Sequence, residues 1–201
     1  MIKFSNFNIS SKYKPINLTV ELGQIVHITA SNKVEERLLF DILSGQSKQY
    51  SGEIYINNYP LAYNSNEMKK CIQFISKHQT FYNQVAVGRQ LSLLSLRWSG
   101  CDLSGSAMKA LRVTGLKNIA YSKLTIEERK KIELARLLAC PASIWLLEGV
   151  DGGFSEEFTS IVRDLILHRV SRNGIVFLTT KKPVKGLDKL FNCNINFTTL
   201  N

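Results

Sequence analysis

The sequence has few of the residues that build metal sites, disulfide scaffolds and membrane spans. It contains four cysteines, none of them in a CxxC pair, and three histidines. This scarcity argues against a zinc site and a disulfide framework, and it predicts four reduced thiols. No apolar run reaches the roughly 18 residues of a membrane-spanning helix, and the opening MIKFSNFNIS lacks the apolar core of a secretion signal. We therefore expect the chain in the cytoplasm.

Acidic residues are scarce relative to basic ones. The chain has 26 lysines and arginines against 16 aspartates and glutamates, which gives a net charge of +10. Such an excess favours a nucleic acid, an anionic membrane surface or an acidic partner. The basic clusters at 129–131 and 181–182 are short and typical of solvated faces, and no alternation of aromatic and basic residues indicates a base-stacking surface. Nucleic-acid binding is therefore not the expected function.

The hydrophobic pattern predicts strands that alternate with helices. The expected strands lie in INLTVELGQIVHIT, SGEIYINNYPL, CIQFIS, SIWLLEGV and GIVFLTT, and the expected helices in EERLLFDILSG, TIEERKKIELARLLA and SEEFTSIVRDLILHRV. Gly45 is the expected C-cap of the first helix, and Ile126 is expected on the apolar side of the second. This order predicts an α/β fold with a mostly parallel sheet covered on both faces.

We predict one domain over residues 1–201. Its core comprises residues 1–84 and 119–201, and residues 85–118 form a helical subdomain, because QLSLLSLRW and SGSAMKALRVTGL have helical patterns separated by glycine and serine.

One loop raises a question about phosphate binding. Residues 29–39 read TASNKVEERLL, between an expected strand and an expected helix, which is where many proteins bind phosphate. This loop has no glycine. Asn32 followed by Glu35 fits a capping box for a helix that begins at Lys33. The alternatives are a phosphate loop that has lost its chemistry and an ordinary surface turn.

The ordered motifs GQIV, LSG, SGEI, LARL, IWLLEGV and LTTKKP resemble those of the nucleotide-binding subunit of an ABC transporter. Within that superfamily they are most similar to the haem-exporter ATPase of cytochrome c maturation. The resemblance implies an ABC-type P-loop NTPase-like fold with an antiparallel N-terminal β portion. It also implies ATP and magnesium as cofactors, membrane-spanning partner subunits, a homo- or heterodimer of nucleotide-binding domains, and a peripheral position on the inner face of the cell membrane.

The resemblance places the family's phosphate loop, GPNGAGKST, on residues 30–38. Its positions hold, in order, Ala30, Ser31, Asn32, Lys33, Val34, Glu35, Glu36, Arg37 and Leu38. Only Asn32 matches. Glu36 replaces the phosphate-binding lysine, and Arg37 replaces the serine that meets magnesium. Two like charges about 4 Å apart repel by roughly 1 kcal/mol in water and about 4 kcal/mol at an intermediate dielectric, so Glu36 opposes a triphosphate.

Other catalytic positions of the family also differ. Glu148 stands at the metal-binding aspartate of the Walker B strand, where it could still hold a metal. Gly149 stands at the catalytic glutamate and has no group to polarise water. Ser155 replaces the D-loop aspartate. Lys181 replaces the switch histidine, and a lysine is a poor substitute for a neutral imidazole.

Two more positions carry contacts to nucleotide in the family. Lys77 falls at the Q-loop glutamine, and Gln79 lies two residues on, where it could serve only after a local shift. Phe7 lies near the adenine-stacking aromatic of the family, although a place in the core is the alternative.

The family's signature loop, LSGGQ, falls on a segment with two glutamates. Its five positions hold Leu124, Thr125, Ile126, Glu127 and Glu128. Thr125 keeps a hydroxyl group, but the glutamates would place carboxylates near a partner's phosphates. Thr125 and Glu128 also fit a capping box, which is the interpretation we favour.

The catalytic positions depart together while the apolar framework persists. We therefore predict a nucleotide-binding subunit of a haem-exporter-like transporter that is impaired or inactive in ATP hydrolysis. One alternative is an ATPase subunit that remains active. The other is a non-catalytic basic protein that binds partners or nucleic acid on a reused ABC fold.

Overall fold

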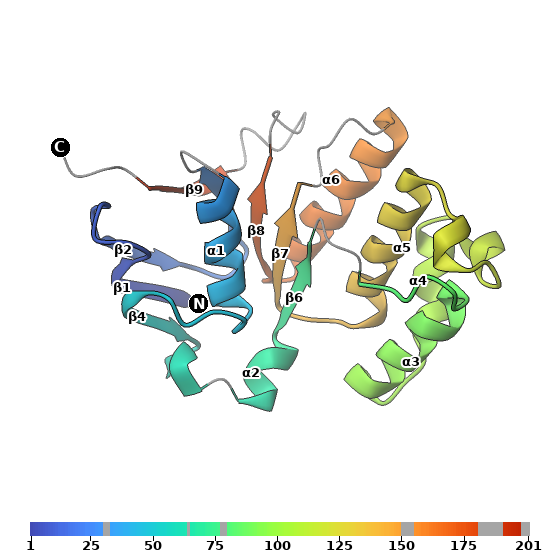
Figure 1. The fold of residues 1–201 in the computed structure, drawn as a ribbon, viewed down its shortest axis with the longest axis horizontal. Coiled ribbons are helices and arrows are strands. Elements are labelled where there is room, and N and C mark those ends of the chain that lie inside the picture. The colour runs from blue at the N-terminus through green and yellow to red at the C-terminus, as the bar shows by residue number, and fades with distance from the viewer. Residues whose placement is uncertain (30–32, 64, 77–79, 150–154, 181–190, 198–201) are drawn as a thin grey trace.

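The chain folds around two β-sheets with helices between and beside them (Figure 1). The computed structural model describes residues 1–29, 33–63, 65–76, 80–149, 155–180 and 191–197. Within this part of the chain, no helix is long and apolar enough to cross a membrane.

The first sheet is antiparallel and lies near the N-terminus. It consists of β1 (Ile2–Asn8), β2 (Ile16–Val20), β4 (Ser51–Ile56) and β5 (Tyr59–Pro60), in the order β2-β1-β4-β5. At Gly52 the backbone has φ +77°, and a Cβ would overlap the carbonyl oxygen of Asn6. Only glycine therefore lets β4 approach β1 closely at this point. The sheet confirms the expected antiparallel β portion.

The second sheet is parallel and forms the centre of the molecule. It consists of β3 (Ile25–Thr29), β6 (Ile72–Ile75), β7 (Ile144–Glu148), β8 (Ile175–Thr179) and β9 (Phe191–Asn196), in the order β6-β7-β8-β3-β9. Every residue of β7 and β8 is buried. Such continuous apolar runs are typical of parallel strands covered on both faces, as predicted. The sequence did not predict β9.

The helices divide between the two faces of the parallel sheet. They are α1 (Lys33–Leu43), α2 (Asn66–Lys70), α3 (Val87–Ser99), α4 (Ser104–Ala110), α5 (Ile126–Ala139) and α6 (Glu156–Ser171), with 3₁₀ turns at Leu61–Tyr63, Thr114–Leu116 and Tyr121–Lys123. Figure 1 shows α1 between the two sheets, and α5 and α6 on the other side of the parallel sheet. Gly45, at φ +76°, follows α1 and confirms the predicted C-cap.

Two hydrophobic cores result from this arrangement. In β7, Leu146 packs with α1 and the antiparallel sheet, whereas Leu147 packs with the helices on the opposite face. The prediction for Ile126 is wrong, because this side chain is 73% exposed at the first turn of α5. Helices α3 and α4 lie within residues 85–118, but the boundaries of a helical subdomain stay a prediction.

Candidate functional site

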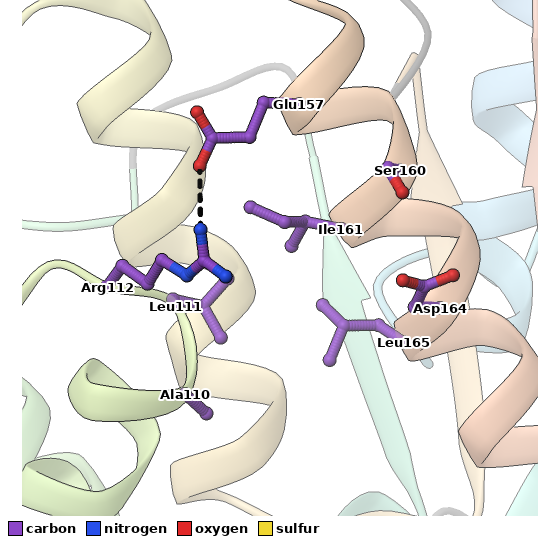
Figure 2. Close-up of a pocket in the computed structure, with 8 residues that line it drawn as sticks. All are labelled: Ala110, Leu111, Arg112, Glu157, Ser160, Ile161, Asp164 and Leu165. Atoms are coloured by element: carbon purple, nitrogen blue, oxygen red, sulfur yellow. Dashed lines mark ion pairs between the residues drawn. The ribbon is translucent and has the colours of Figure 1, made fainter.

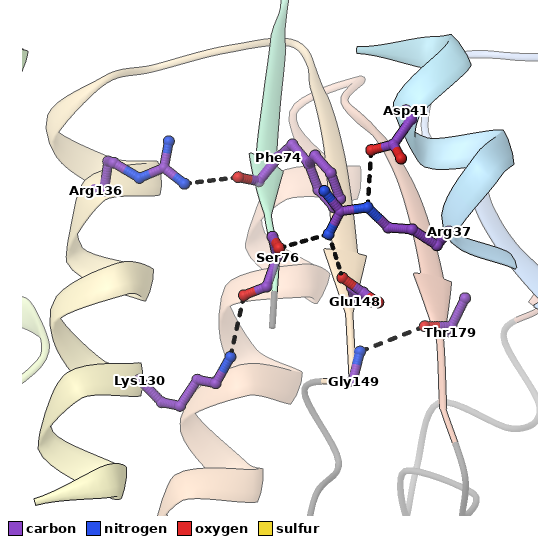
Figure 3. A network of polar contacts seen from close by, with 9 residues as sticks. All are labelled: Arg37, Asp41, Phe74, Ser76, Lys130, Arg136, Glu148, Gly149 and Thr179. Carbon is purple, nitrogen blue, oxygen red and sulfur yellow. Dashed lines mark hydrogen bonds and ion pairs between the residues drawn. The ribbon is translucent and has the colours of Figure 1, made fainter. Parts of the chain in front are cut away.

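The carboxyl ends of the parallel strands face the first turns of α1. In open α/β sheets this edge is where ligands bind. Figure 3 shows Arg37 on α1 pointing toward Glu148 at the end of β7 and Ser76 just after β6. Residues far apart in the sequence therefore meet at one place.

Arg37 forms the centre of a polar network at this edge. Its Nε lies 2.8 Å from Oδ1 of Asp41, one turn further along α1, and its Nη1 lies 2.7 Å from Oγ of Ser76. The same Nη1 lies 3.0 Å from Oε2 of Glu148, whose side chain is only 8% exposed. The guanidinium also lies over the ring of Phe74, 4.8 Å from its centroid. These contacts fix the cation between α1, β6 and β7.

The ion pair bears directly on metal binding. By resemblance, Arg37 and Glu148 stand at the two positions through which the family holds magnesium. Here one of them is a cation that already pairs with the other. A divalent ion beside the guanidinium would be repelled. Within the described parts of the chain, no group of three histidine, cysteine, aspartate or glutamate residues is placed to hold a metal ion. The residues present therefore do not fit magnesium.

Glu35 ties the first turn of α1 to the loop between β1 and β2. Its Oε1 accepts a hydrogen bond from the Tyr13 hydroxyl and lies 2.9 Å from Nζ of Lys12. Hydrogen bonds with Tyr13 and then with Glu35 raise the pKa of Lys12. The Glu35 side chain is only 8% exposed, so these contacts offset the burial of its charge. No sequence pattern indicated a role for Tyr13.

The rest of the phosphate-loop segment is only partly described. Helix α1 begins at Lys33, as predicted, and Lys33 is exposed while Glu36 and Leu38 are half-buried. Asn32 lies outside the described residues, so the capping box with Glu35 stays a prediction. Both glutamates of the first turn lie near the positive end of the helix dipole, which stabilises them.

Gly149 directly follows β7 and has a left-handed backbone, at φ +60°. Its N–H donates to the carbonyl oxygen of Thr179 over 3.2 Å and lies 3.3 Å from the Oγ1 atom of the same residue. The position supplies a backbone bond to β8 and no acid or base. Lys77, Gln79 and Lys181 fall outside the described residues, so the predictions for them stay predictions.

The prediction that Phe7 could stack on adenine is wrong. Phe7 is fully buried, with its ring 5.3 Å from that of Phe4 and 5.8 Å from that of Tyr50. Since these partners belong to the core between the sheets, the alternative core assignment is confirmed.

The predicted capping box at the start of α5 is confirmed. Thr125 accepts a hydrogen bond from the backbone N–H of Glu128, and the Glu128 carboxylate accepts one from the backbone N–H of Thr125 over 2.8 Å. Leu124 is buried and Ile126 is exposed on either side of Thr125. These signature-loop residues therefore organise a helix start.

Glu127 joins this helix start to that of α6. Its carboxylate accepts hydrogen bonds from Oγ of Ser155 over 3.0 Å and from the backbone N–H of the same residue over 3.3 Å. These bonds lower the pKa of Glu127, with a smaller effect from Lys131. Ser155 in turn caps α6 through the N–H of Phe158. The signature-loop and D-loop positions thus bind each other.

Cationic side chains of α5 also form hydrogen bonds with β6, the edge strand of the parallel sheet. The sequence analysis did not predict these contacts. Arg136 donates to Oε1 of Gln73 over 2.7 Å and to the carbonyl oxygen of Phe74 over 2.6 Å. Lys130 donates to the carbonyl oxygen of Ser76 over 3.3 Å (Figure 3). Cations thereby cover carbonyl groups of an edge strand that would otherwise be open to pairing.

Glu133 lies between these cations on the buried side of α5. It accepts from the backbone N–H of Thr80 over 3.2 Å and lies 3.4 Å from Nε of Arg136. Burial raises the pKa of Glu133, although Arg136 acts in the opposite direction. A signal for this contact was present in the sequence, because Glu133 and Arg136 are oppositely charged and lie three residues apart on the apolar face of an expected helix.

Solved structures with the same fold are found among ABC transporter subunits. One described as an ATP binding subunit of an ABC transporter has a TM-score of 0.83 at 11% identity, and covers 98% of this chain and 85% of that chain. A putative ABC transporter ATP-binding protein from Pyrococcus furiosus has a TM-score of 0.78 at 20% identity, and covers 98% and 96%. These likenesses confirm the predicted fold class.

Proteins of similar sequence also include ATP-binding transport proteins. The cytochrome c biogenesis ATP-binding export protein CcmA of Saccharophagus degradans is 26% identical over 193 residues, covering 86% of this chain and 81% of that protein. The ABC transporter I family member 1 of Arabidopsis thaliana is 25% identical over 184 residues, covering 88% and 78%.

A family model gives the broadest match. The model described as ABC transporter matches residues 13–149, from the loop before β2 to the end of β7. The match spans more than half of the 201 residues and includes both partners of the Arg37–Glu148 pair. The chain belongs to the ABC transporter family.

Proposed function

We propose that this chain is a nucleotide-binding-type subunit of a haem-exporter-like membrane transporter and that it does not hydrolyse ATP efficiently. Similarity to the CcmA export protein over most of both chains supports the transporter assignment. By the same resemblance, its partners are membrane-spanning subunits and a second nucleotide-binding subunit, and its location is the inner face of the membrane.

The observation that carries the proposal is the contact between Arg37 and Glu148. The Nη1–Oε2 distance of 3.0 Å places a permanent cation on the carboxylate that a metal would need. An arginine keeps its charge at every physiological pH, so it does not leave the pair by losing a proton. The pair therefore acts as a built-in structural substitute for a metal ion.

Two further features also oppose ATP hydrolysis. The carboxylate of Glu35 stands where phosphate would need a glycine amide, and Tyr13 and Lys12 already bind it. Gly149 provides no general base for water. Glu35 and its partners thus weaken phosphate binding, the Arg37–Glu148 pair weakens magnesium binding, and Gly149 weakens the activation of water.

Phosphate release by the purified chain tests the catalytic part. We expect no release above that of a Glu148→Gln variant, and no saturable binding of Mg-ATP. The double variant Glu36→Lys/Arg37→Ser restores a cationic side chain and a hydroxyl, so we expect it to bind Mg-ATP more tightly than the wild type does. Saturable hydrolysis by the wild type that Glu148→Gln abolishes would instead support the active-ATPase alternative.

Purification from detergent-solubilised membranes tests the assembly. We expect a tagged chain to bring membrane-spanning subunits with it. Recovery without any such subunit, together with steeply salt-dependent binding to DNA or RNA, would contradict the transporter assignment and support a nucleic-acid-binding protein.

A further inference from the structure

Acidic residues are scarce in one part of the chain, which gives that part a net positive charge. Residues 85–123 contain six lysines and arginines against one acidic residue, Asp102. All six are exposed, namely Arg89, Arg97, Lys109, Arg112, Lys117 and Lys123. This segment lies at the end of the molecule opposite the antiparallel sheet (Figure 1). This segment therefore carries half of the protein's net charge of +10.

The outer side of α3 combines charge with exposed leucines. Arg89, Leu93, Leu96 and Arg97 follow one another at helical spacing, so they form one stripe along the helix. Leu93 is 58% exposed and Leu96 is 45% exposed, whereas Leu91 of the same helix is fully buried in the core. We call these four residues the α3 stripe. Two leucines on an exposed helix face, between two arginines, are typical of surfaces that contact a membrane interface.

Other basic residues of this segment lie near acidic side chains, whereas the arginines of the α3 stripe do not form ion pairs in the described part of the chain. Arg112 lies 3.6 Å from Glu157 of α6, beside a cavity of about 360 Å³ between α4 and α6 (Figure 2). Asp102 accepts from Ser92 over 2.6 Å, and Lys117 contributes to the low pKa of Asp102 after its hydrogen bonds with Ser104 and Ser92. In the described part of the chain, no ion pair involves the two arginines of the α3 stripe.

We propose that the α3 stripe is a contact surface for anionic lipid headgroups. Its arginines bind lipid phosphates, and its leucines enter the headgroup region, where exposed apolar area is removed from water. An anionic membrane suits both halves of the stripe, while a nucleic acid suits only the arginines. The inference rests on the proposed function because that function brings the chain to a membrane, but the contact itself requires no partner subunit.

Vesicle binding by the full purified chain, without nucleotide or transporter subunits, tests the proposal. The probes are vesicles of phosphatidylcholine alone and vesicles with about one third phosphatidylglycerol, at low salt. We expect binding to the anionic vesicles only. Arg89→Gln/Arg97→Gln should weaken it about 30-fold, since each cation near such a surface contributes about fivefold. Leu93→Ser/Leu96→Ser should weaken it about tenfold.

A matched control removes the same charge at the other end of the molecule. Lys3 and Lys14 are exposed on β1 and on the loop that follows it, so Lys3→Gln/Lys14→Gln should leave vesicle binding within about twofold, because it changes net charge equally without touching the stripe. All variants should unfold within a few degrees of the wild type, since every substituted side chain is exposed.

Several results would overturn the proposal. Equal binding to neutral and anionic vesicles, equal losses in the control and stripe variants, or no vesicle binding at all would each do so. Tighter binding to RNA than to vesicles, lost in the arginine variant, would assign the stripe to nucleic acid. Because ATP hydrolysis and subunit co-purification are measured separately, failure here leaves the proposed function intact, and failure there leaves this surface intact.

Discussion

Helices α1 and α5 begin alike and use their acidic residues differently. Each has two adjacent glutamates in its first turn, at the phosphate-loop and signature-loop positions of the family. On α1, the Glu35 side chain is 8% exposed and is bound by Tyr13 and Lys12 from another element. On α5, Glu128 closes a local capping box with Thr125 in an exposed place.

The difference between the two helix starts follows from burial. A carboxylate removed from water needs hydrogen bonds or an ion pair, so a buried glutamate recruits partners from distant segments. The less buried carboxylate of Glu128 needs only the free backbone N–H groups of its own helix, whereas Glu127 beside it also binds Ser155 at the start of α6. Charges at the start of α1 should therefore matter greatly to stability, and those at the start of α5 and just after α4 should matter less.

The largest effect is expected at the buried ion pair. Arg37→Met removes the cation that lies 3.0 Å from the Glu148 carboxylate, whose side chain is only 8% exposed, and we expect a loss of about 3 kcal/mol in the free energy of unfolding. Urea denaturation followed by circular dichroism measures it. A double variant, Arg37→Met/Glu148→Met, should recover most of the loss, because the most deeply buried charge is then gone. Asp41 also loses its contact with Arg37, but its side chain is 25% exposed and stays solvated. If Arg37→Met were as stable as the wild type, the buried charges around α1 would contribute no more to stability than the exposed ones at the start of α5.

A pH-dependent effect is expected at Glu133. Burial raises its pKa in the folded state, so the folded protein binds a proton more tightly there than the unfolded chain does. The stabilisation is complete below the ordinary carboxyl pKa of about 4.3 and is lost as pH rises through the higher folded value.

The slope of this loss cannot exceed about 1.4 kcal/mol per pH unit for one proton. Denaturation midpoints of the wild type and of Glu133→Gln, measured from pH 4 upward, test it. The variant keeps an acceptor for the Thr80 N–H but does not titrate, so the wild type should lose stability relative to it as pH rises. Parallel curves for the two proteins would contradict the direction of the shift.

A smaller effect is expected at the start of α5. Thr125→Ala removes the side-chain half of the capping box, which typically costs about 1 kcal/mol of unfolding free energy. Thr114→Ala, also at an exposed threonine, is the matched control and should change stability by less than about 0.5 kcal/mol. Equal losses in the two variants would show that the box contributes nothing of its own.

Local patterns predicted the features that depend on local sequence. Spacing alone predicted the start of α1 at Lys33, the box at Thr125 and Glu128, and the buried run of β7. Each of these depends on residues within a turn or a strand of one another. The family resemblance, carried by ordered short motifs, then supplied the arrangement of the sheets.

Contacts between distant elements were not predictable in this way. Nothing near Arg37 in the sequence indicates Glu148, which is 111 residues away, or Ser76. The Tyr13 hydroxyl contacts Glu35 because the β1–β2 loop lies against the first turn of α1. Strand β9 was missed although FNCNIN alternates apolar and polar residues, because three of its six residues are asparagines, which are uncommon in strands. Its pairing with β3 defines it. The partners of the charged residues had to come from the fold.

The smallest effect is expected at the ion pair between Arg112 and Glu157, the exposed counterpart of the buried pair. Its atoms are 3.6 Å apart and its side chains are 81% and 57% exposed, so water and salt screen the attraction. Arg112→Ala should cost less than about 0.5 kcal/mol of unfolding free energy at 0.1 M salt, and the cost should vanish near 1 M salt. The loss in Arg37→Met should persist at high salt, because its charges are screened less. A salt-independent loss at Arg112 would mean that this contact joins α4 to α6 through packing, and the distinction between buried and exposed charges would then fail at the surface.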